Sequence, residues 1–171
     1  KPQSTSISNS QVLFEDYSFI KARTVLKEMV ELGSLRLVEK GLMTNTVGIY
    51  IGYSKDIIKA TGGTKLINNY TNVYSELLKA ALYIYDVTTN KQVPIRRIGI
   101  NFSKVIEKED VQLSLFENQE KIDKERKLEL TICDIKNKIG KNTIIRGIDL
   151  QKEATAILRN KLIGGHNRWV V

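Results

Sequence analysis

Hydroxyl and basic side chains alternate with apolar ones in two segments near opposite ends of the first hundred residues. Ser6, Ser8 and Ser10 alternate along one segment, and Arg97 and Asn101 share one side of the other. Hydroxyls and guanidinium groups are common partners of phosphate oxygens in nucleic acids. If both segments are strands of one sheet, the spacing predicts a face that binds phosphates rather than bases.

A second feature is the apolar cluster Gln112–Phe116 (QLSLF), which lies between acidic and lysine-rich flanks. A strand would alternate for longer, and an amphipathic helix would repeat its apolar residues beyond one cluster. Exposed apolar clusters indicate a partner. Leu113, Leu115 and Phe116 are therefore predicted to be buried by another protein. In the alternative interpretation, Leu115 and Phe116 pack on their own domain.

The elements that position these residues follow from periodicity. Alternation predicts strands at residues 4–15, 46–54, 61–68 and 93–107. Apolar residues at helical spacing predict one helix after Asp16 or Ser18, which ends at Gly33. They predict a second helix that Thr71 or Asn72 caps. This order predicts an α+β, ferredoxin-like βαββαβ sheet with two helices on one face and the other face open.

The remaining third of the chain is predicted to be a mostly helical tail. A charged helix over 120–139 would present Leu128, Ile132, Ile135 and Ile139 as its apolar stripe, and Gly140 would end it. A short extended piece follows, and then one more helix that ends at Gly164. The predicted divisions are a sheet domain at 1–106, a linker at 107–121 and the tail at 122–171.

Composition narrows the functional classes. The 171 residues carry a net charge of +8 and are 42% hydrophobic, and residues 1–105 hold 14 Lys and Arg against 8 Asp and Glu. A basic excess favours polyanionic partners, although a solvated basic surface is an equally simple interpretation. The single cysteine, Cys133, excludes an internal disulfide and a thiolate metal site and fits a cytoplasmic protein. No apolar run is long enough for a bilayer, so no membrane partner is expected.

Other chemistries are weaker interpretations of the same residues. The RNA-recognition motif needs aromatic residues on its two central strands. If these are the first and third strands, they offer only serines and the sequence Thr64–Leu66. His166 has no base–nucleophile arrangement around it, so a polar loop position is the simpler interpretation.

The segments at 4–17, 62–81 and 94–107 resemble, in their order and spacing, the little finger domain of Y-family DNA polymerases. The resemblance covers roughly residues 4–106. In addition, LRNKLIGGHN near the end resembles the tail of UmuC-like polymerases from Gram-positive bacteria, their plasmids and phages. The resemblance implies a C-terminal fragment of an error-prone translesion polymerase of DNA repair and SOS damage tolerance, associated with the nucleoid.

The resemblance also implies a function for particular residues. A little finger grips the phosphates of primer–template duplex DNA without sequence preference. Arg96 and Arg97 match the family's arginine pair, and Asn101 stands where some relatives have a basic residue. The full set expected at the DNA is Ser6, Ser8, Ser10, Lys65, Arg96, Arg97 and Asn101.

The catalytic carboxylates of such polymerases sit in a palm domain, for which no matching strand is visible here. The chain is therefore expected to have no catalytic residue, no metal site and no cofactor of its own, and magnesium is expected in the palm.

The cluster at 112–116 resembles the sliding-clamp-binding motif of bacterial polymerases, Gln-Leu-(Ser/Asp)-Leu-Phe. This implies a bacterial sliding clamp as partner, bound through Gln112, Leu113, Ser114, Leu115 and Phe116. The tail is expected to dock on the little finger, on a UmuD-like subunit or recombinase filament, or on a second copy. The competing hypotheses are a stand-alone ferredoxin-like RNA-binding or regulatory module, and an adaptor that binds no nucleic acid.

Overall fold

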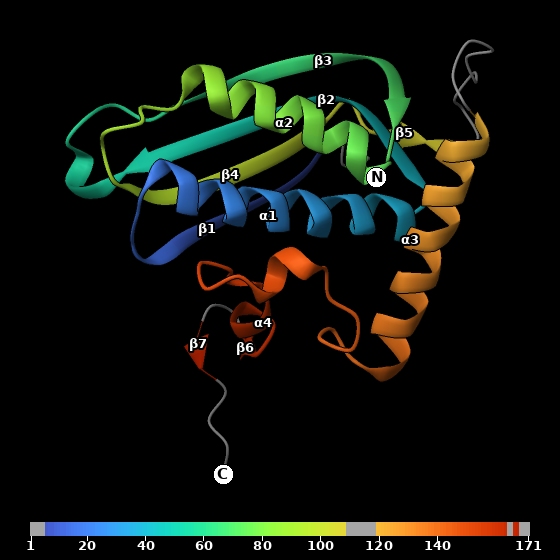
Figure 1. The fold of residues 1–171 in the computed structure, drawn as a ribbon. Coiled ribbons are helices and arrows are strands. Elements are labelled where there is room, and N and C mark those ends of the chain that lie inside the picture. The colour runs from blue at the N-terminus through green and yellow to red at the C-terminus, as the bar shows by residue number, and fades with distance from the viewer. Residues whose placement is uncertain (1–5, 109–118, 164–165, 168–171) are drawn as a thin grey trace.

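Four long antiparallel strands form the sheet of the computed structural model, which describes residues 6–108, 119–163 and 166–167. They are β1 (Ser6–Tyr17), β2 (Leu42–Tyr53), β3 (Thr61–Thr71) and β4 (Ile95–Ser103). The helices α1 (Phe19–Glu39) and α2 (Tyr74–Thr88) cover one face, as Figure 1 shows. The predicted α+β arrangement is confirmed. The single turn η1 (Ser54–Asp56) follows β2, and the short strand β5 (Ile106–Glu107) pairs with the start of β2.

The strand order is β1-β4-β2-β3, so β4 and β2 are central and β1 and β3 are edges. The expectation that the first and third strands are central is wrong, because alternation fixes the two faces of a strand but not its neighbours. The open face of β2 carries Tyr50, which is 46% exposed. Within the described residues this is the one aromatic on the open face of the central strands, whereas an RNA-recognition motif stacks two or three bases.

The core lies between the sheet and the two helices. Val47, Ile49 and Ile51 of β2 are buried there with Ile98 and Ile100 of β4. Alternate residues of both strands are apolar, so one face of each is driven against the helices by burial.

Helix α1 does not end at Gly33, as predicted, but continues to Glu39. A Cβ at Gly33 would lie 2.2 Å from Cε2 of Phe102, so this glycine lets the helix approach β4 closely. Two residues after Glu39 the chain turns away at Gly41, whose φ is +64° and whose N–H donates to the Val38 carbonyl at 3.1 Å.

The two helices begin in different ways. Ser18 caps α1, accepting a hydrogen bond from the Lys21 N–H at 3.4 Å. Neither Thr71 nor Asn72 caps α2. The N–H of Tyr74 donates to Glu129 at 3.1 Å, and the N–H of Ser75 donates to Glu125 at 3.0 Å. These acceptors lie 50 and 55 residues away in sequence, so local patterning does not identify them.

Both glutamates belong to α3 (Gln119–Ile139), which ends before Gly140 as predicted. The predicted apolar stripe is wrong, however, because Leu128 and Ile139 are 58% and 71% exposed. The buried side chains of this helix are Arg126, Glu129 and Cys133. Polar groups at the start of α2 and on α1 need partners, and this requirement outweighs the burial of a narrow apolar stripe.

The rest of the tail is less helical than expected. It contains the turn η3 (Gly147–Leu150), the short helix α4 (Ala156–Arg159) and the hairpin strands β6 (Leu162–Ile163) and β7 (His166–Asn167). The predicted helix ending at Gly164 is therefore wrong. This part of the tail lies along α1, on the side away from α2 (Figure 1).

A buried carboxylate on α1 holds the start of α4. Glu28 accepts hydrogen bonds from the N–H groups of Thr155 and Ala156 at 3.0 and 2.9 Å.

The division of the chain at residues 106 and 121 stays a prediction. Of the helices in the described ranges, none has the length and apolar character needed to cross a membrane.

Candidate nucleic-acid interface

The open face of the sheet is built from rows of cross-strand neighbours. In one row Ser8 of β1 lies opposite Asn101 of β4, which lies opposite Gly48 of β2, which lies opposite Thr64 of β3. Residues opposite one another in a ladder project to the same side. The register thus brings a hydroxyl, an amide and a second hydroxyl together across the sheet.

The next row consists of Ser10, Gly99, Tyr50 and Gly62 in the same strand order. Ser10, Gly99 and Tyr50 of this row, together with the first row, line a shallow hollow of about 720 Å³. A Cβ at Gly48 would meet no atom closer than 3.5 Å, so packing does not require glycine at this position. Because glycine has no side chain to project above the sheet, a ligand can approach the backbone closely here.

The two arginines of the predicted set are not equivalent. Arg97 lies opposite both Val12 and Gly52, projects from the open face and forms no ion pair within the described part of the chain. Arg96 lies where the register between β2 and β4 shifts. Its Nη1 is 3.6 Å from Oδ1 of Asp16 and donates to the Phe14 carbonyl at 3.4 Å. Half of the expected arginine pair is therefore engaged within the protein.

Lys65, also predicted with this set, lies on the other side of the sheet. It is opposite Val47, whose side chain is in the core, and its Nζ is 4.1 Å from the ring centroid of Tyr83 on α2. The expectation that Lys65 joins the open face is wrong, whereas Ser6, opposite Ser103 of β4, extends that face by one further row.

Most residues of this face can be identified from the sequence alone. In the sequence Gly48, Tyr50 and Gly52 alternate with apolar residues, as Arg97 and Asn101 do, so each set lies on one side of its strand. What the sequence does not show is that these sides adjoin, because that depends on the strand order. The five predicted clamp-binding residues, 112–116, lie outside the described residues and stay a prediction.

Carboxylates of α1 and α3 hold the tail and the start of α2. Burial raises the pKa of Glu129 to about 7 and raises the pKa of Glu28 and Glu31. Each contacts a donor from the tail or from α2: Glu31 Oε2 is 3.3 Å from Nε of Arg146, whose guanidinium also lies over the Tyr74 ring at 4.1 Å. Across the described residues, no group of three or more His, Cys, Asp or Glu side chains is placed to hold a metal ion.

Cys133 is a packing residue in this arrangement. Its thiol is buried and contacts the Leu35 carbonyl at 3.5 Å. Burial raises the pKa of the thiol to about 11, which keeps it protonated and unreactive.

Comparison with known proteins agrees with this geometry. Residues 4–115 match the model of the impB/mucB/samB family C-terminal domain. DNA polymerase IV 2 of Halalkalibacterium halodurans is 30% identical over 164 residues, which are 94% of this chain and 39% of that protein. DNA polymerase IV 2 of Bacillus subtilis is 28% identical over 169 residues, with the same two coverages of 94% and 39%. The chain thus spans about two fifths of the length of these relatives.

Solved structures are more distant. A complex of a beta-clamp processivity factor with the little finger domain of PolIV aligns with 66% of this chain and 99% of that chain, at 13% identity and a TM-score of 0.47. This likeness is too remote to bear on function. The family match covers well over half of the sequence, so the chain belongs to the impB/mucB/samB family C-terminal domain, the little finger domain of Y-family DNA polymerases.

Proposed function

We propose that this chain is the DNA-gripping part of an error-prone Y-family translesion polymerase, and that its open sheet face binds duplex DNA without sequence preference. The observation that carries the proposal is the hollow in which Ser8, Ser10, Asn101 and Arg97 surround glycines, on a face that none of the described helices covers. These groups donate hydrogen bonds to phosphate oxygens, and contacts to phosphates fix position without reading sequence.

The grip is supplied by side chains. The N–H groups of β2 and β4 are largely used by their ladders, because each strand has a partner on both sides. Gly48 and Gly99 therefore contribute close approach, Ser8 and Ser10 contribute hydroxyl donors, and Arg97 contributes the charge. A surface that contacts only the DNA backbone tolerates damaged or mispaired bases, because it makes no contact with the base edges.

The whole polymerase would supply what this chain lacks. Nucleotidyl transfer needs carboxylate-bound Mg²⁺, which we place in a palm domain outside this chain. Tethered to that domain, a weak grip becomes effective, because the tether supplies a high local concentration. The proposed setting is damage tolerance during an SOS response, in the nucleoid of a bacterial cytoplasm.

The test is fluorescence anisotropy of a labelled duplex across a salt series. Arg97→Ala should weaken every sequence alike and lower the slope of log K against log salt by about one. Arg96→Ala should have a smaller effect, because Arg96 is already paired with Asp16. Lys65→Ala is the matched control, since it removes the same charge from the opposite face.

Two outcomes would contradict the assignment of the face. One is Arg97→Ala binding duplex as tightly as wild type, and the other is Lys65→Ala weakening binding as much as Arg97→Ala. A preference for single-stranded RNA over duplex DNA would favour the RNA-binding alternative.

We further propose that residues 112–116 recruit the polymerase to a bacterial sliding clamp. Support comes from the residue types, which match a clamp-binding motif, and from their position at the end of the segment that matches the family model, residues 4–115. Burial of a Leu or Phe side chain contributes roughly 1.5–3 kcal/mol. Several such side chains, less the cost of ordering the peptide, correspond to about micromolar affinity.

Binding to a purified clamp, measured by surface plasmon resonance, tests this proposal. Leu115→Ala with Phe116→Ala should abolish binding, and Ser114→Ala should leave it within about twofold. Undiminished binding by the double variant would refute the proposal. A UmuD-like subunit or a recombinase filament stays a proposed partner of the tail.

A further inference from the structure

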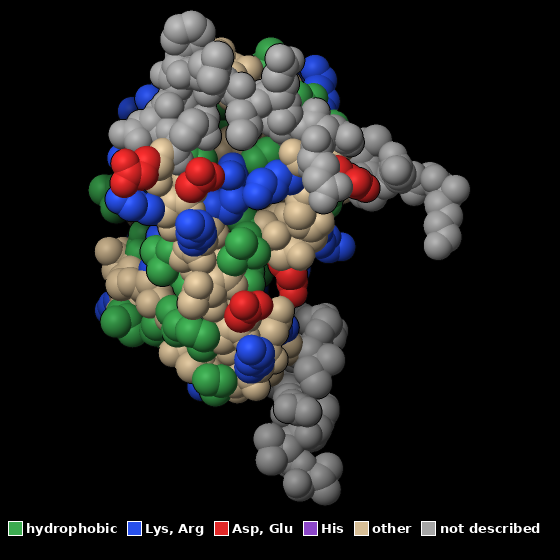
Figure 2. Space-filling model, turned by 90° about the vertical axis from the view of Figure 1, so that its right-hand side faces the viewer, with side chains coloured by type: hydrophobic (Ala, Val, Ile, Leu, Met, Phe, Trp, Pro, Cys, Tyr) green, Lys and Arg blue, Asp and Glu red, His purple; other side chains and the backbone are tan. Residues whose placement is uncertain are grey.

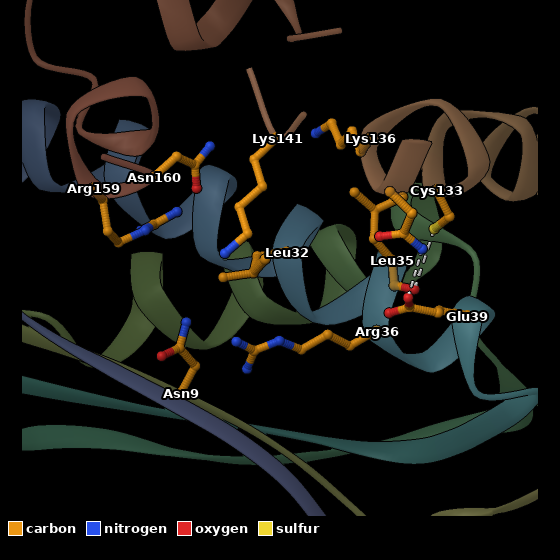
Figure 3. Close-up of a pocket in the computed structure, with 11 residues that line it drawn as sticks. Asn9, Leu32, Leu35, Arg36, Glu39, Cys133, Lys136, Lys141, Arg159 and Asn160 are labelled. Atoms are coloured by element: carbon orange, nitrogen blue, oxygen red, sulfur yellow. Dashed lines mark hydrogen bonds between the residues drawn. The ribbon is translucent and has the colours of Figure 1, made fainter. Parts of the chain in front are cut away.

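Four basic side chains line a pocket where the tail meets α1 and β1. The pocket has a volume of about 330 Å³ and is bordered by Arg36 of α1, Lys136 of α3, Lys141 of the following loop and Arg159 of α4. Figure 3 shows Arg36, Lys141 and Arg159 pointing toward one another from three segments, with Asn9 of β1 beside them. Three segments that are far apart in sequence thus bring the charged ends of their basic side chains together.

Much of this positive charge is not neutralised within the protein. Arg36 and Lys141 are exposed and form no ion pair among the described residues. The acidic residue that borders the pocket, Glu39, accepts a hydrogen bond from Asn137 at 2.8 Å. Like charges held close together are unfavourable unless an anion lies between them.

The two deeper cations are held in place by the fold. Arg159 donates from Nη1 to Oε1 of Gln11 at 2.7 Å, and Lys136 Nζ is 3.7 Å from Oε1 of Glu31. Burial lowers the pKa of Arg159; the nearby carboxylates of Glu28 and Asp149 oppose this shift, and the charge of Arg36 adds to it. The guanidinium group is therefore oriented before any ligand arrives, which reduces the entropy lost on binding.

The position of the pocket indicates the kind of anion. β1 is an edge strand, and its alternate side chains point to opposite sides of the sheet. Ser8 and Ser10 line the hollow of the open face, whereas Asn9, which lies between them, borders both that hollow and the basic pocket. A strand that leaves the open face over the β1 edge therefore passes directly into the pocket.

We propose that this pocket binds backbone phosphates of a single DNA strand that continues beyond the duplex held on the open face. Arginine forks match phosphate oxygens, and a cluster of two arginines and two lysines neutralises a phosphodiester backbone. A duplex is too stiff to turn around the edge of one strand, whereas a single strand is flexible. The proposed path of the strand from the duplex to the pocket rests on the proposed function of the open face. The affinity of the pocket for single-stranded DNA does not depend on that function.

Basic side chains also continue outside the pocket. Figure 2 looks onto the α3 side of the molecule, where Lys and Arg side chains gather in a band between acidic and apolar ones. Such a band attracts a polyanion to this side of the molecule from a distance. It gives no site by itself, because solvated lysines on a helix face do not fix a ligand.

The test compares a blunt duplex with the same duplex carrying a single-stranded extension. Wild type should bind the extended DNA more tightly. Arg36→Gln with Lys141→Gln should lose that gain, roughly tenfold at low salt, and lower the salt slope for the extended DNA by about 1.4. Binding of blunt duplex should not change. Lys127→Gln with Lys138→Gln removes the same charge from exposed positions of α3 outside the pocket and should keep most of the gain.

Direct occupancy is read by nuclear magnetic resonance, from the Nε–Hε signals of Arg36 and Arg159 during titration with oligothymidylate. Both signals should shift, and inorganic phosphate should shift them only at much higher concentration. If the Arg36/Lys141 variant keeps the gain from the extension, the inference is wrong and the duplex face is unaffected. A glutamate-rich peptide that outcompetes oligothymidylate would also overturn it, in favour of an acidic protein segment. If blunt duplex is not bound at all and the variant still loses oligothymidylate binding, the duplex face fails and the pocket stands.

Discussion

Replacing Glu129 by glutamine removes one buried charge at the point where α3 meets α1 and α2. Glu129 is 1% exposed and accepts hydrogen bonds from the Tyr74 N–H at 3.1 Å and from the Ser34 hydroxyl at 3.2 Å. Nη2 of Arg146 is 3.8 Å from the same carboxylate. Glutamine has nearly the same shape and still offers a carbonyl acceptor. The substitution therefore changes the charge and leaves most contacts intact.

The magnitude follows from proton linkage. Burial raises the pKa of Glu129 from an ordinary 4.5 to about 7 in the folded chain. Between these values the folded state binds more protons than the unfolded state, so the contribution of this group to stability is present below about pH 4.5 and is lost as pH rises through about 7. At about 1.4 kcal/mol per pKa unit the whole effect is about 3 kcal/mol, of which about 2 kcal/mol falls between pH 5.5 and 8.

Urea unfolding followed by circular dichroism at these two pH values measures the difference. Wild type should lose more stability than Glu129→Gln on going from the lower to the higher pH, by about 2 kcal/mol. Glu28 and Glu31 have pKa values raised by burial as well, so they contribute with the same sign in both proteins and cancel in the comparison.

Glu120→Gln is the matched control on the same helix. Glu120 is exposed and pairs only with Lys124 in an i,i+4 contact, a kind of pair that contributes a few tenths of a kcal/mol. It should keep the pH dependence of wild type. The reasoning is refuted if Glu129→Gln keeps the wild-type pH dependence, since Glu129 would then not be buried against α2 in solution.

Substitutions at three further positions test other parts of the structure. Gly33→Ala should destabilise the domain by about 1–2 kcal/mol, visible as a lower Tm, because overpacking against Phe102 outweighs the gain in helix propensity. Gly48→Glu should reduce duplex affinity by tenfold or more in the anisotropy assay without changing Tm. Gly48→Ala adds only a methyl group and should weaken binding much less, and equal binding by the two variants would remove the open face from consideration. Glu28→Ala should leave the N–H groups of Thr155 and Ala156 without acceptors and speed their hydrogen exchange at least tenfold. The exchange of the sheet amides should change little. Unchanged exchange at Thr155 and Ala156 would mean that α4 is held by other contacts.

The sequence by itself determined the features that depend on near neighbours along the chain. Alternation placed Ser8 and Ser10 on one side of a strand and Arg97 and Asn101 on one side of another, because successive residues of a strand point to opposite faces. The long helix at 119–139 and its end at Gly140 followed from composition and from the conformational freedom of glycine. These features are local, so no knowledge of the partner elements is needed to predict them.

Only the tertiary structure decided which local surfaces meet. The order β1-β4-β2-β3 puts Asn101 beside Gly48 and makes one hollow of two separately predicted faces. Lys65 lies toward the helices because β3 is an edge strand with weak apolar alternation, which leaves its facing to be fixed by register with β2. The cap acceptors for α2 are Glu125 and Glu129 of α3, so α3 turns this charged side inward and its leucines outward. The acceptor at the start of α4 is Glu28 of α1, which is also distant in sequence. A buried hydrogen-bond requirement between segments far apart in sequence has no periodicity along the chain, and for that reason no reading of one segment at a time predicts it.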